Sequence, residues 1–128
     1  MKINHFSKIT AAPVDMEGAV GCTIRVLVND ADGAPHFAMR QFEVAPGGHT
    51  PRHTHDFEHE VYVLEGDGSV LYEEEEHPLQ PGSFAYVPAN ELHRFTNTGE
   101  TPFKFLCLVP ILPEECTPGD SCCCCNPH

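Results

Sequence analysis

The sequence predicts an all-β domain, an antiparallel sandwich or barrel built from short strands. Runs rich in Val, Ile, Phe and Tyr recur along the chain, and these residue types favour strands. Breaks that contain Gly, Pro and Asn separate the runs at near-regular intervals, a spacing typical of sandwiches and barrels. No stretch of useful length has the apolar period of an amphipathic helix. These observations together favour a fold without a helical layer.

Each expected strand is a run of apolar or β-branched residues that ends at a turn signal. In chain order the runs are Gly21–Val28, Phe37–Val44, His53–Leu64, Ser69–Tyr72, Ser83–Val87, His93–Asn97 and Phe103–Val109. The first 20 residues are open to two interpretations, an edge strand or a swapped arm. The acidic run Glu73–Glu76 indicates a solvated hairpin tip. We expect no core strand beyond about Val109, because Pro110 and Pro113 interrupt a strand ladder.

Length and charge narrow the classes of function. With 128 residues the chain is expected to form one domain over residues 1–110, followed by a Pro- and Cys-rich tail over 111–128. Nineteen acidic against seven basic residues give a formal charge of −12, which argues against a nucleic acid or an anionic membrane surface as partner. No signal peptide or membrane-length apolar run is evident, so we expect a cytoplasmic protein with reduced cysteines.

Histidines form the most informative pattern. His53, His55, His59 and the carboxylate of Glu60 lie close together, and His93 stands in a second patterned segment. Residues two apart on a strand point the same way, with Cα atoms roughly 6.6–7 Å apart, so their imidazoles can converge on one ion. Neutral imidazole suits Zn, Cu, Fe and Ni, and an added carboxylate admits Mn. The pattern predicts a site for one divalent transition metal.

Two spaced motifs carry a family resemblance. The first runs from Gly47 through His53, His55 and Glu60 to Gly66, and the second runs from Gly82 through Pro88 and His93 to Asn97. This order and spacing closely resemble the two motifs of the cupin superfamily, over Ala45–Val109. The resemblance implies a small double-stranded β-helix barrel with jelly-roll connectivity and an internal metal at the positions of His53, His55 and His93. Asn90 stands where the second motif usually has Gly, and Asn tolerates left-handed backbone angles.

The fourth ligand has two candidates. In many cupins it is the Glu at the position of Glu60. The string His-Thr-His-Asp-Phe-Glu-His-Glu is similar to small bacterial cupins with four-histidine sites, which implies His59 instead. On a regular strand His53, His55 and His59 share one face, whereas Glu60 needs a bulge to join them. We therefore expect His59 as the ligand, with Glu60 as an alternate ligand or a partner that orients the imidazoles.

Two further residues lie on strand faces that could turn inward. Cys107 shares a face with Phe103 and Phe105, so it either approaches the metal as a candidate catalytic residue or is a small buried hydrophobe, and we favour the second interpretation. Arg40 shares parity with apolar neighbours and could hold a substrate carboxylate. We favour an edge-facing, snorkelling Arg40 over an inward one.

The resemblance leads to two main functional hypotheses. The first is a mononuclear-metal oxidoreductase, a dioxygenase of a small organic acid or diketone-like molecule, in which the ion positions substrate and O₂. Phe84, Phe95 and Phe105 would form the apolar wall of its pocket. The second is a non-catalytic metal- or small-molecule-binding cupin. A sugar isomerase ranks third, because the chain has no evident basic cluster to hold a sugar phosphate. In each case a homodimer is expected.

The cysteine-rich tail bears on the second hypothesis. Cys116 and Cys122–Cys125 lie in it. Adjacent cysteines are poor disulfide partners, because their Cα atoms are about 3.8 Å apart, below the usual range of roughly 4.4–6.8 Å. Crowded thiolates could bind Cu(I) or Zn(II) and serve in metal handling. The other interpretation is a tail with reactive thiols.

Overall fold

The structure is a computed structural model that describes residues 1–111. The expectations for the tail, including Cys116 and Cys122–Cys125, lie outside these residues. The described chain forms the strands β1 (Ala12–Pro13), β2 (Val20–Val28), β3 (Phe37–His49), β4 (His59–Glu65), β5 (Gly68–Tyr72), β6 (Glu75–Leu79), β7 (Phe84–Val87), β8 (Phe95–Asn97) and β9 (Phe103–Pro110), with the short 3₁₀ helices η1 (Phe6–Lys8) and η2 (Asp30–Asp32). None of its helices is long and apolar enough to cross a membrane. The predicted all-β class is confirmed.

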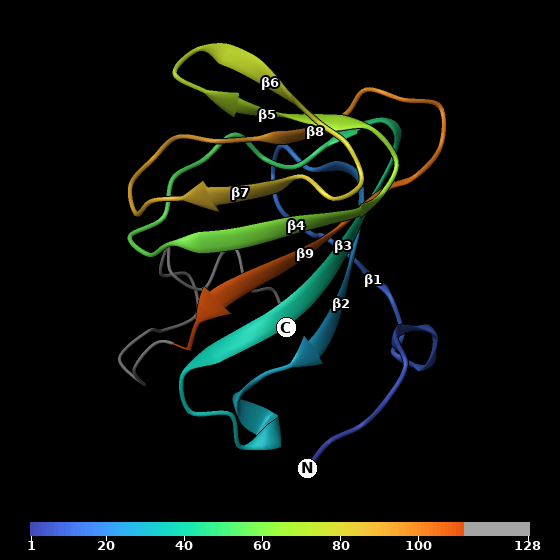
Figure 1. Ribbon diagram of the computed structural model, residues 1–128, viewed down its shortest axis with the longest axis vertical. Coiled ribbons are helices and arrows are strands. Elements are labelled where there is room, and N and C mark those ends of the chain that lie inside the picture. Colours follow the sequence, from blue (N-terminus) through green and yellow to red (C-terminus); the bar gives the residue numbers. More distant parts are fainter. Residues whose placement is uncertain (112–128) are drawn as a thin grey trace.

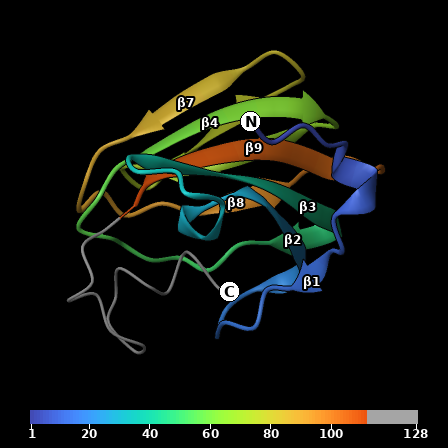
Figure 2. The same ribbon diagram turned by 90° about the horizontal axis from the view of Figure 1, so that it is seen from below.

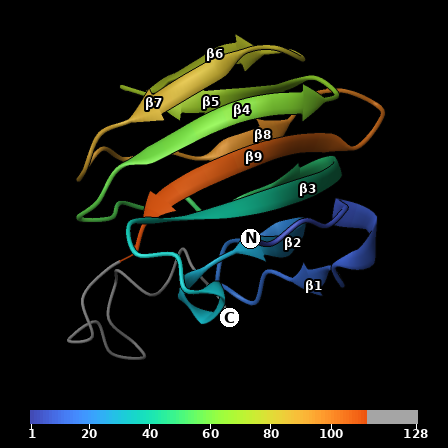
Figure 3. The same cartoon turned by 60° about the horizontal axis from the view of Figure 1, so that its bottom comes forward.

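All strand pairs are antiparallel, and together they make a nearly closed barrel. The order of neighbours is β6-β5-β8-β3-β9-β4-β7, with β2 joined to β3 and β1 joined to β2. Figure 1 shows the strands stacked from β6 and β5 at the top to β1 and β2 at the bottom. The sheet curves back on itself in the views of Figures 2 and 3. Strand β3 makes this possible, because it pairs with β9 along Phe37–Val44 and with β8 at His49.

Strand β9 shows how the sequence pattern builds the interior. Its residues alternate between buried and half-buried, so Phe103, Phe105 and Cys107 point inward, as strand geometry requires. The ring of Phe105 stacks on Phe42 of β3, with centroids 5.3 Å apart, and lies 4.9 Å from the ring of Phe95 on β8. Burying one such side chain stabilises the fold by about 1.5–3 kcal/mol. These rings therefore hold three strands around one interior.

The expected strand over His53–Leu64 is wrong in its first half. Regular pairing begins only at His59, and His53 forms an isolated antiparallel bridge with His93. The preceding Pro51 has no N–H to donate to a strand ladder, and bends follow at Asp56 and Phe57. The segment before β4 is therefore a loop that crosses toward the segment before β8.

Three other expectations can be compared with the structure. Part of the N-terminal segment is an edge strand, because Ala12 and Pro13 of β1 pair with β2 of the same chain. Glu73 and Glu74 do form a hairpin tip, with φ of 51° and 69°. The rest of the acidic run belongs to β6, which the sequence did not predict because its Glu-Glu-His-Pro pattern lacks apolar alternation. Asn90 has φ 68°, in the left-handed region that was expected for it.

Asn97 closes the end of the barrel with its side chain. It is 4% exposed. Its amide nitrogen donates to the carbonyl oxygens of Val44 and Thr101, at 2.9 and 2.8 Å, and its amide oxygen accepts from the N–H of Gly99 at 2.8 Å. One side chain thus satisfies backbone groups on β3 and on the loop between β8 and β9.

We expect Asn97→Ala to lower the free energy of unfolding by about 3 kcal/mol, because it leaves buried backbone groups without partners at about 1–3 kcal/mol each. Urea unfolding of the variant and of the wild type measures the difference. Thr98→Ala is the matched control, since Thr98 is exposed and keeps its backbone bond to Asp67. A loss below about 1 kcal/mol, or an equal loss in the control, would contradict this role.

Candidate metal centre

Three histidines lie together inside the barrel. The ligand nitrogens of His53, His55 and His93 are all within 4.8 Å of one another. His55 and His93 are 3% and 5% exposed, and His53 is half-buried. The N–H of His53 donates to the carbonyl oxygen of His93 and the N–H of His93 donates to that of His53, both at 3.2 Å. Backbone pairing between two distant segments therefore brings the cluster together.

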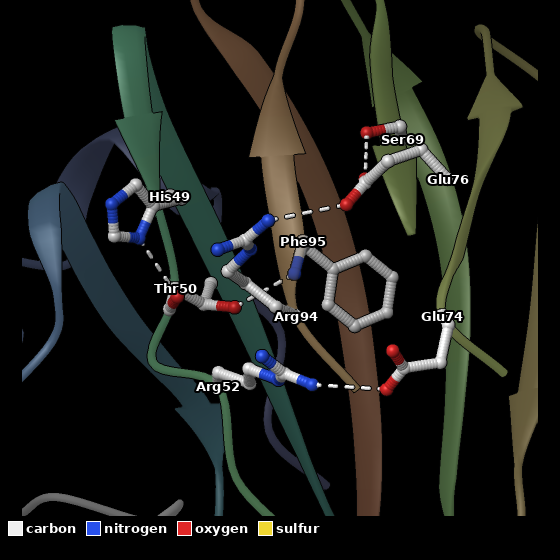
Figure 4. A network of polar contacts seen from close by, with 8 residues as sticks. All are labelled: His49, Thr50, Arg52, Ser69, Glu74, Glu76, Arg94 and Phe95. Atoms are coloured by element: carbon white, nitrogen blue, oxygen red, sulfur yellow. Dashed lines mark hydrogen bonds and ion pairs between the residues drawn. The ribbon is translucent and has the colours of Figure 1, made fainter. Parts of the chain in front are cut away.

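A second pair of hydrogen bonds joins the same two segments next to the histidine cluster. The N–H of Thr50 donates to the carbonyl oxygen of Phe95 at 2.8 Å, and the N–H of Phe95 donates to the Thr50 hydroxyl at 2.9 Å. Figure 4 shows this contact between the end of β3 and the start of β8. Since Thr50 precedes His53 and Phe95 follows His93, these bonds set the spacing of the two ligand-bearing segments.

Ion pairs tie the β5–β6 hairpin to the same region. Arg94 pairs with Glu76 at 3.1 Å, Arg52 pairs with Glu74 at 3.4 Å, and the Ser69 hydroxyl donates to Glu76 at 2.7 Å (Figure 4). The side chains of Arg52 and Glu74 are 51% and 83% exposed. An exposed pair of this kind contributes at most about 1 kcal/mol. The ligand segments thus depend chiefly on backbone and Thr50 hydrogen bonds.

Hydrogen bonds orient two of the imidazoles. Nδ1 of His53 lies 2.6 Å from the carbonyl oxygen of Pro51, and Nδ1 of His93 lies 2.9 Å from that of Glu91. A carbonyl oxygen only accepts, so each Nδ1 carries the proton and each Nε2 keeps its lone pair. This arrangement is common for metal-ligating histidines, because it sets both the tautomer and the ring orientation.

His59, the first residue of β4, lies beside the three. Its ring centroid is 5.0 Å from that of His55 and 5.1 Å from that of His93, and it is 4% exposed. Within residues 1–111 its buried Nε2 has no hydrogen-bond partner, a state that costs about 1–3 kcal/mol. A metal ion would satisfy this nitrogen. The donor set therefore fits a divalent transition metal, and His59 as its fourth ligand stays a prediction.

Burial keeps these imidazoles neutral. It lowers the pKa of His53 and His93, in each case as the largest effect. Burial, followed by the positive charges of His93 and Arg40, lowers the pKa of His59 to about 2. Metal ions bind neutral imidazole, so the cluster at neutral pH is in the form that ligates a metal.

Glu60 does not join the cluster. It is exposed, and strand alternation places it on the outer face because His59 faces inward. Burial, followed by a hydrogen bond with Glu58, raises the pKa of Glu60 to about 7. This outward position gives no support to Glu60 as an alternate ligand or orienting partner, and that role stays a prediction. The orienting acceptors of His53 and His93 are the backbone carbonyls of Pro51 and Glu91.

Cys107 and Arg40 both reach the site. The Cys107 sulfur lies 3.4 Å from Nδ1 of His59 and accepts from the Arg40 guanidinium at 3.1 Å. Cys107 is thus more than the simple buried hydrophobe that we favoured. The favoured edge-facing position of Arg40 is wrong, because its exposure is 0%. Its parity with Ala38, Phe42 and Val44 was the signal that pointed inward.

An apolar pocket opens onto the histidines. Its wall includes Phe42, Phe95 and Phe105, together with Val14 and Met16 from the N-terminal segment. Phe95 and Phe105 line it as expected, whereas Phe84 is 80% exposed on β7. Sequence patterns did not indicate Val14 or Met16, because both lie outside the expected strands. Polar groups enter the pocket chiefly from the histidines, Thr50, Cys107 and Arg40.

Comparison with known proteins assigns this arrangement to a family. The family model described as "Cupin domain" matches residues 40–109, more than half of the chain. The chain belongs to the cupin family. The solved cupin-fold structure of the polyketide cyclase RemF from Streptomyces resistomycificus is 32% identical, with a TM-score of 0.82, and the match covers 96% of this chain and 91% of RemF.

Curated relatives match over shorter stretches. The 1-methylthio-D-xylulose 5-phosphate methylsulfurylase of Rhodospirillum rubrum is 31% identical over 83 residues, which are 60% of this chain and 53% of the enzyme. The glucose-6-phosphate isomerase of Pyrococcus abyssi is 44% identical over 57 residues, which are 40% of this chain and 30% of the isomerase. This cupin thus spans about half or less of these relatives. Their similarity supports the barrel and its motifs.

Buried neutral histidines make stability depend on pH. Below its ordinary value of 6.5, His59 is protonated in the unfolded chain and neutral in the folded one. The unfolded state then binds more protons, so the free energy of unfolding falls as the pH falls. Between pH 6 and 5 the metal-free wild type should lose about 1 kcal/mol more per pH unit than His59→Gln, measured by urea unfolding. Parallel curves for the two proteins would contradict a buried, neutral His59.

Proposed function

We propose that this cupin is a metal-dependent enzyme that binds a small, enolisable polycarbonyl compound in the barrel pocket and promotes its cyclisation. The observation that carries the proposal is the aromatic-lined pocket that ends on a cluster of neutral imidazoles. A bound divalent metal would supply Lewis-acid polarisation of a carbonyl oxygen. His53, His55 and His93 would hold it, with His59 as the fourth ligand.

The pocket walls supply the second requirement of a cyclisation, a folded substrate. A linear polycarbonyl chain has many conformers, and ring closure needs one in which the two reacting carbons lie close together. The ring of Phe105 packs on those of Phe42 and Phe95, with centroids 5.3 and 4.9 Å apart, so the three rings offer a rigid apolar surface for a planar chain. Their apolar surface also keeps water from the activated carbon.

Similarity to RemF supports this reaction class over others. It extends over nearly the whole of both chains, at 32% identity. Sugar phosphates also carry many hydroxyls, and an apolar wall leaves such groups without hydrogen bonds. A hydrophobic, conjugated substrate suits the pocket better.

The first test measures whether the protein contains a metal ion and whether His93 holds it. We expect about one Fe, Mn, Ni, Cu or Zn ion per chain in protein purified without a metal-affinity tag, measured by elemental analysis. His93→Ala should lose the metal, because it removes a buried ligand, and exposed His36→Ala should retain it. Replacing the tail cysteines Cys116 and Cys122–Cys125 by Ser should leave the content unchanged. Metal that follows the cysteines and not His93 would favour the metal-handling alternative instead.

Activity is testable with nonane-2,4,6,8-tetraone, whose aldol closure and loss of one water give a dihydroxy-methylacetophenone. We expect metal-loaded wild type to accelerate this closure at least tenfold over the spontaneous rate, followed by chromatography and mass spectrometry. His93→Ala should fall to the spontaneous rate, and His36→Ala should behave as wild type. No acceleration with any of the five metals would overturn the cyclisation.

An oxygenase is the second candidate. Imidazole ligands carry no charge, so a dipositive ion bound by them would keep its full charge and attract anionic substrates. A donor set of neutral imidazoles also suits Fe(II), which can bind O₂. An oxygen electrode in the same assay separates the candidates, because a dioxygenase consumes one O₂ per product and an aldol closure consumes none.

The expected homodimer and cytoplasmic location stay predictions. The outer face of β4 and β7 would support a dimer, because exposed apolar side chains cluster there around the paired residues Tyr62 and Phe84. These exposed side chains are Tyr62, Leu64, Phe84 and Tyr86, with exposures from 40% to 80%.

A further inference from the structure

Arg40 is the least expected group in the barrel. Its side chain is fully buried, at 0% exposure, and it lines the same pocket as His53, His59 and His93. Its guanidinium carbon lies 5.1 Å from the centroid of the Phe42 ring, over its face. One terminal nitrogen, Nη2, donates to the Cys107 sulfur at 3.1 Å. Thus a permanent cation stands against the aromatic wall, next to the imidazole cluster.

Most of the donors of this cation are unused. Within residues 1–111, Nε and Nη1 of Arg40 have no hydrogen-bond partner, and none of the ion pairs formed there, to 4.0 Å, involves Arg40. A sulfur atom is a weak acceptor. A buried charge without a partner destabilises the folded state, and proteins ordinarily pair it or leave it out. Ring contact with Phe42 offsets part of that destabilisation.

A ligand anion would complete this arrangement. The guanidinium is planar, and each of its two-nitrogen edges joins Nη2 to either Nε or Nη1. The second N–H of Nη2 together with one of the two unpartnered nitrogens therefore matches the two oxygens of a carboxylate or of an ionised β-dicarbonyl. The low-dielectric wall strengthens such a contact relative to water. The other charges in the pocket have the same sign, since a divalent metal adds positive charge and the imidazoles are neutral.

We propose that Arg40 is an anion-binding residue that holds a carboxylate or enolate of the ligand in the pocket, so that the ligand of this cupin is an anionic, largely apolar molecule. The inference rests on the proposed function for the identity of the pocket and adds the charge class of its substrate. Arg40 selects anions over neutral analogues of the same shape, and Phe42 keeps the guanidinium in place.

Benzoate and benzamide test the selection, because they share a planar ring and differ in charge. Calorimetric titrations would use the full-length chain after removal of metal by a chelator, so that the guanidinium alone can hold the carboxylate. Wild type should bind benzoate at least tenfold more tightly than benzamide. Arg40→Met should lose at least tenfold in benzoate affinity and stay within about twofold for benzamide.

Two variants separate ligand binding from a structural role. Arg40→Met should unfold at the wild-type temperature or above, because an apolar side chain of similar volume replaces an unpaired buried charge. Arg40→Lys keeps the charge without the planar fork and should bind benzoate with intermediate affinity. Arg52→Met removes the same charge from an exposed side chain and should leave benzoate binding unchanged.

The outcomes are distinct from those of the cyclisation assay. Equal benzoate affinity in wild type and Arg40→Met, no preference for benzoate over benzamide, or no binding at millimolar concentrations would each overturn the anion-binding role. If Arg40→Met does not fold, the same comparison is made with Arg40→Lys, and wild-type affinity there overturns the preference for a planar fork. Benzoate selection without cyclisation would overturn the proposed reaction and leave Arg40 as an anion-binding residue.

Discussion

The site depends on the antiparallel pairing between the segment that carries His53 and the segment that carries His93. Two backbone hydrogen bonds join these histidines, and the contact between Thr50 and Phe95 extends the pairing by one step. Because backbone bonds set the distance between the segments, the imidazoles converge without help from the exposed ion pairs nearby. The histidine cluster is thus part of the fold of the barrel, and backbone pairing with the segment before β8 holds the loop before β4 in place.

Burial gives the cluster its chemistry. Taking the imidazoles out of water favours their neutral form, and the neighbouring positive charge of Arg40 adds to this preference at His59. Among residues 1–111 the buried Nε2 of His59 has no hydrogen-bond partner, and the buried guanidinium of Arg40 donates only to the Cys107 sulfur. Both groups lie at the pocket wall, where a metal ion would bind the His59 nitrogen and an anionic ligand would pair with the guanidinium. Binding of a metal ion and an anionic ligand would therefore raise the free energy of unfolding.

Much of what could be predicted from the sequence came from its resemblance to the two cupin motifs. Alternation along β9 correctly placed Phe105 and Cys107 inside, because side chains on a strand point to opposite faces by geometry alone. Parity also favoured His59 over Glu60, and the structure agrees on which of the two faces inward. The imidazoles of His53 and His55 also converge as expected, but these residues stand in a loop and not on the regular strand that the parity argument assumed.

The sequence by itself determined the all-β class, the two histidine motifs and the inward alternation of β9, because these follow from local residue types and a period of two. Only the tertiary structure decided that Arg40 is buried without a carboxylate partner among residues 1–111, and that Val14 and Met16 line the pocket. Each of these depends on which segments cross in space. Local preference ordinarily keeps Arg at the surface, and no local pattern reports a cavity formed by strands that are far apart in the chain.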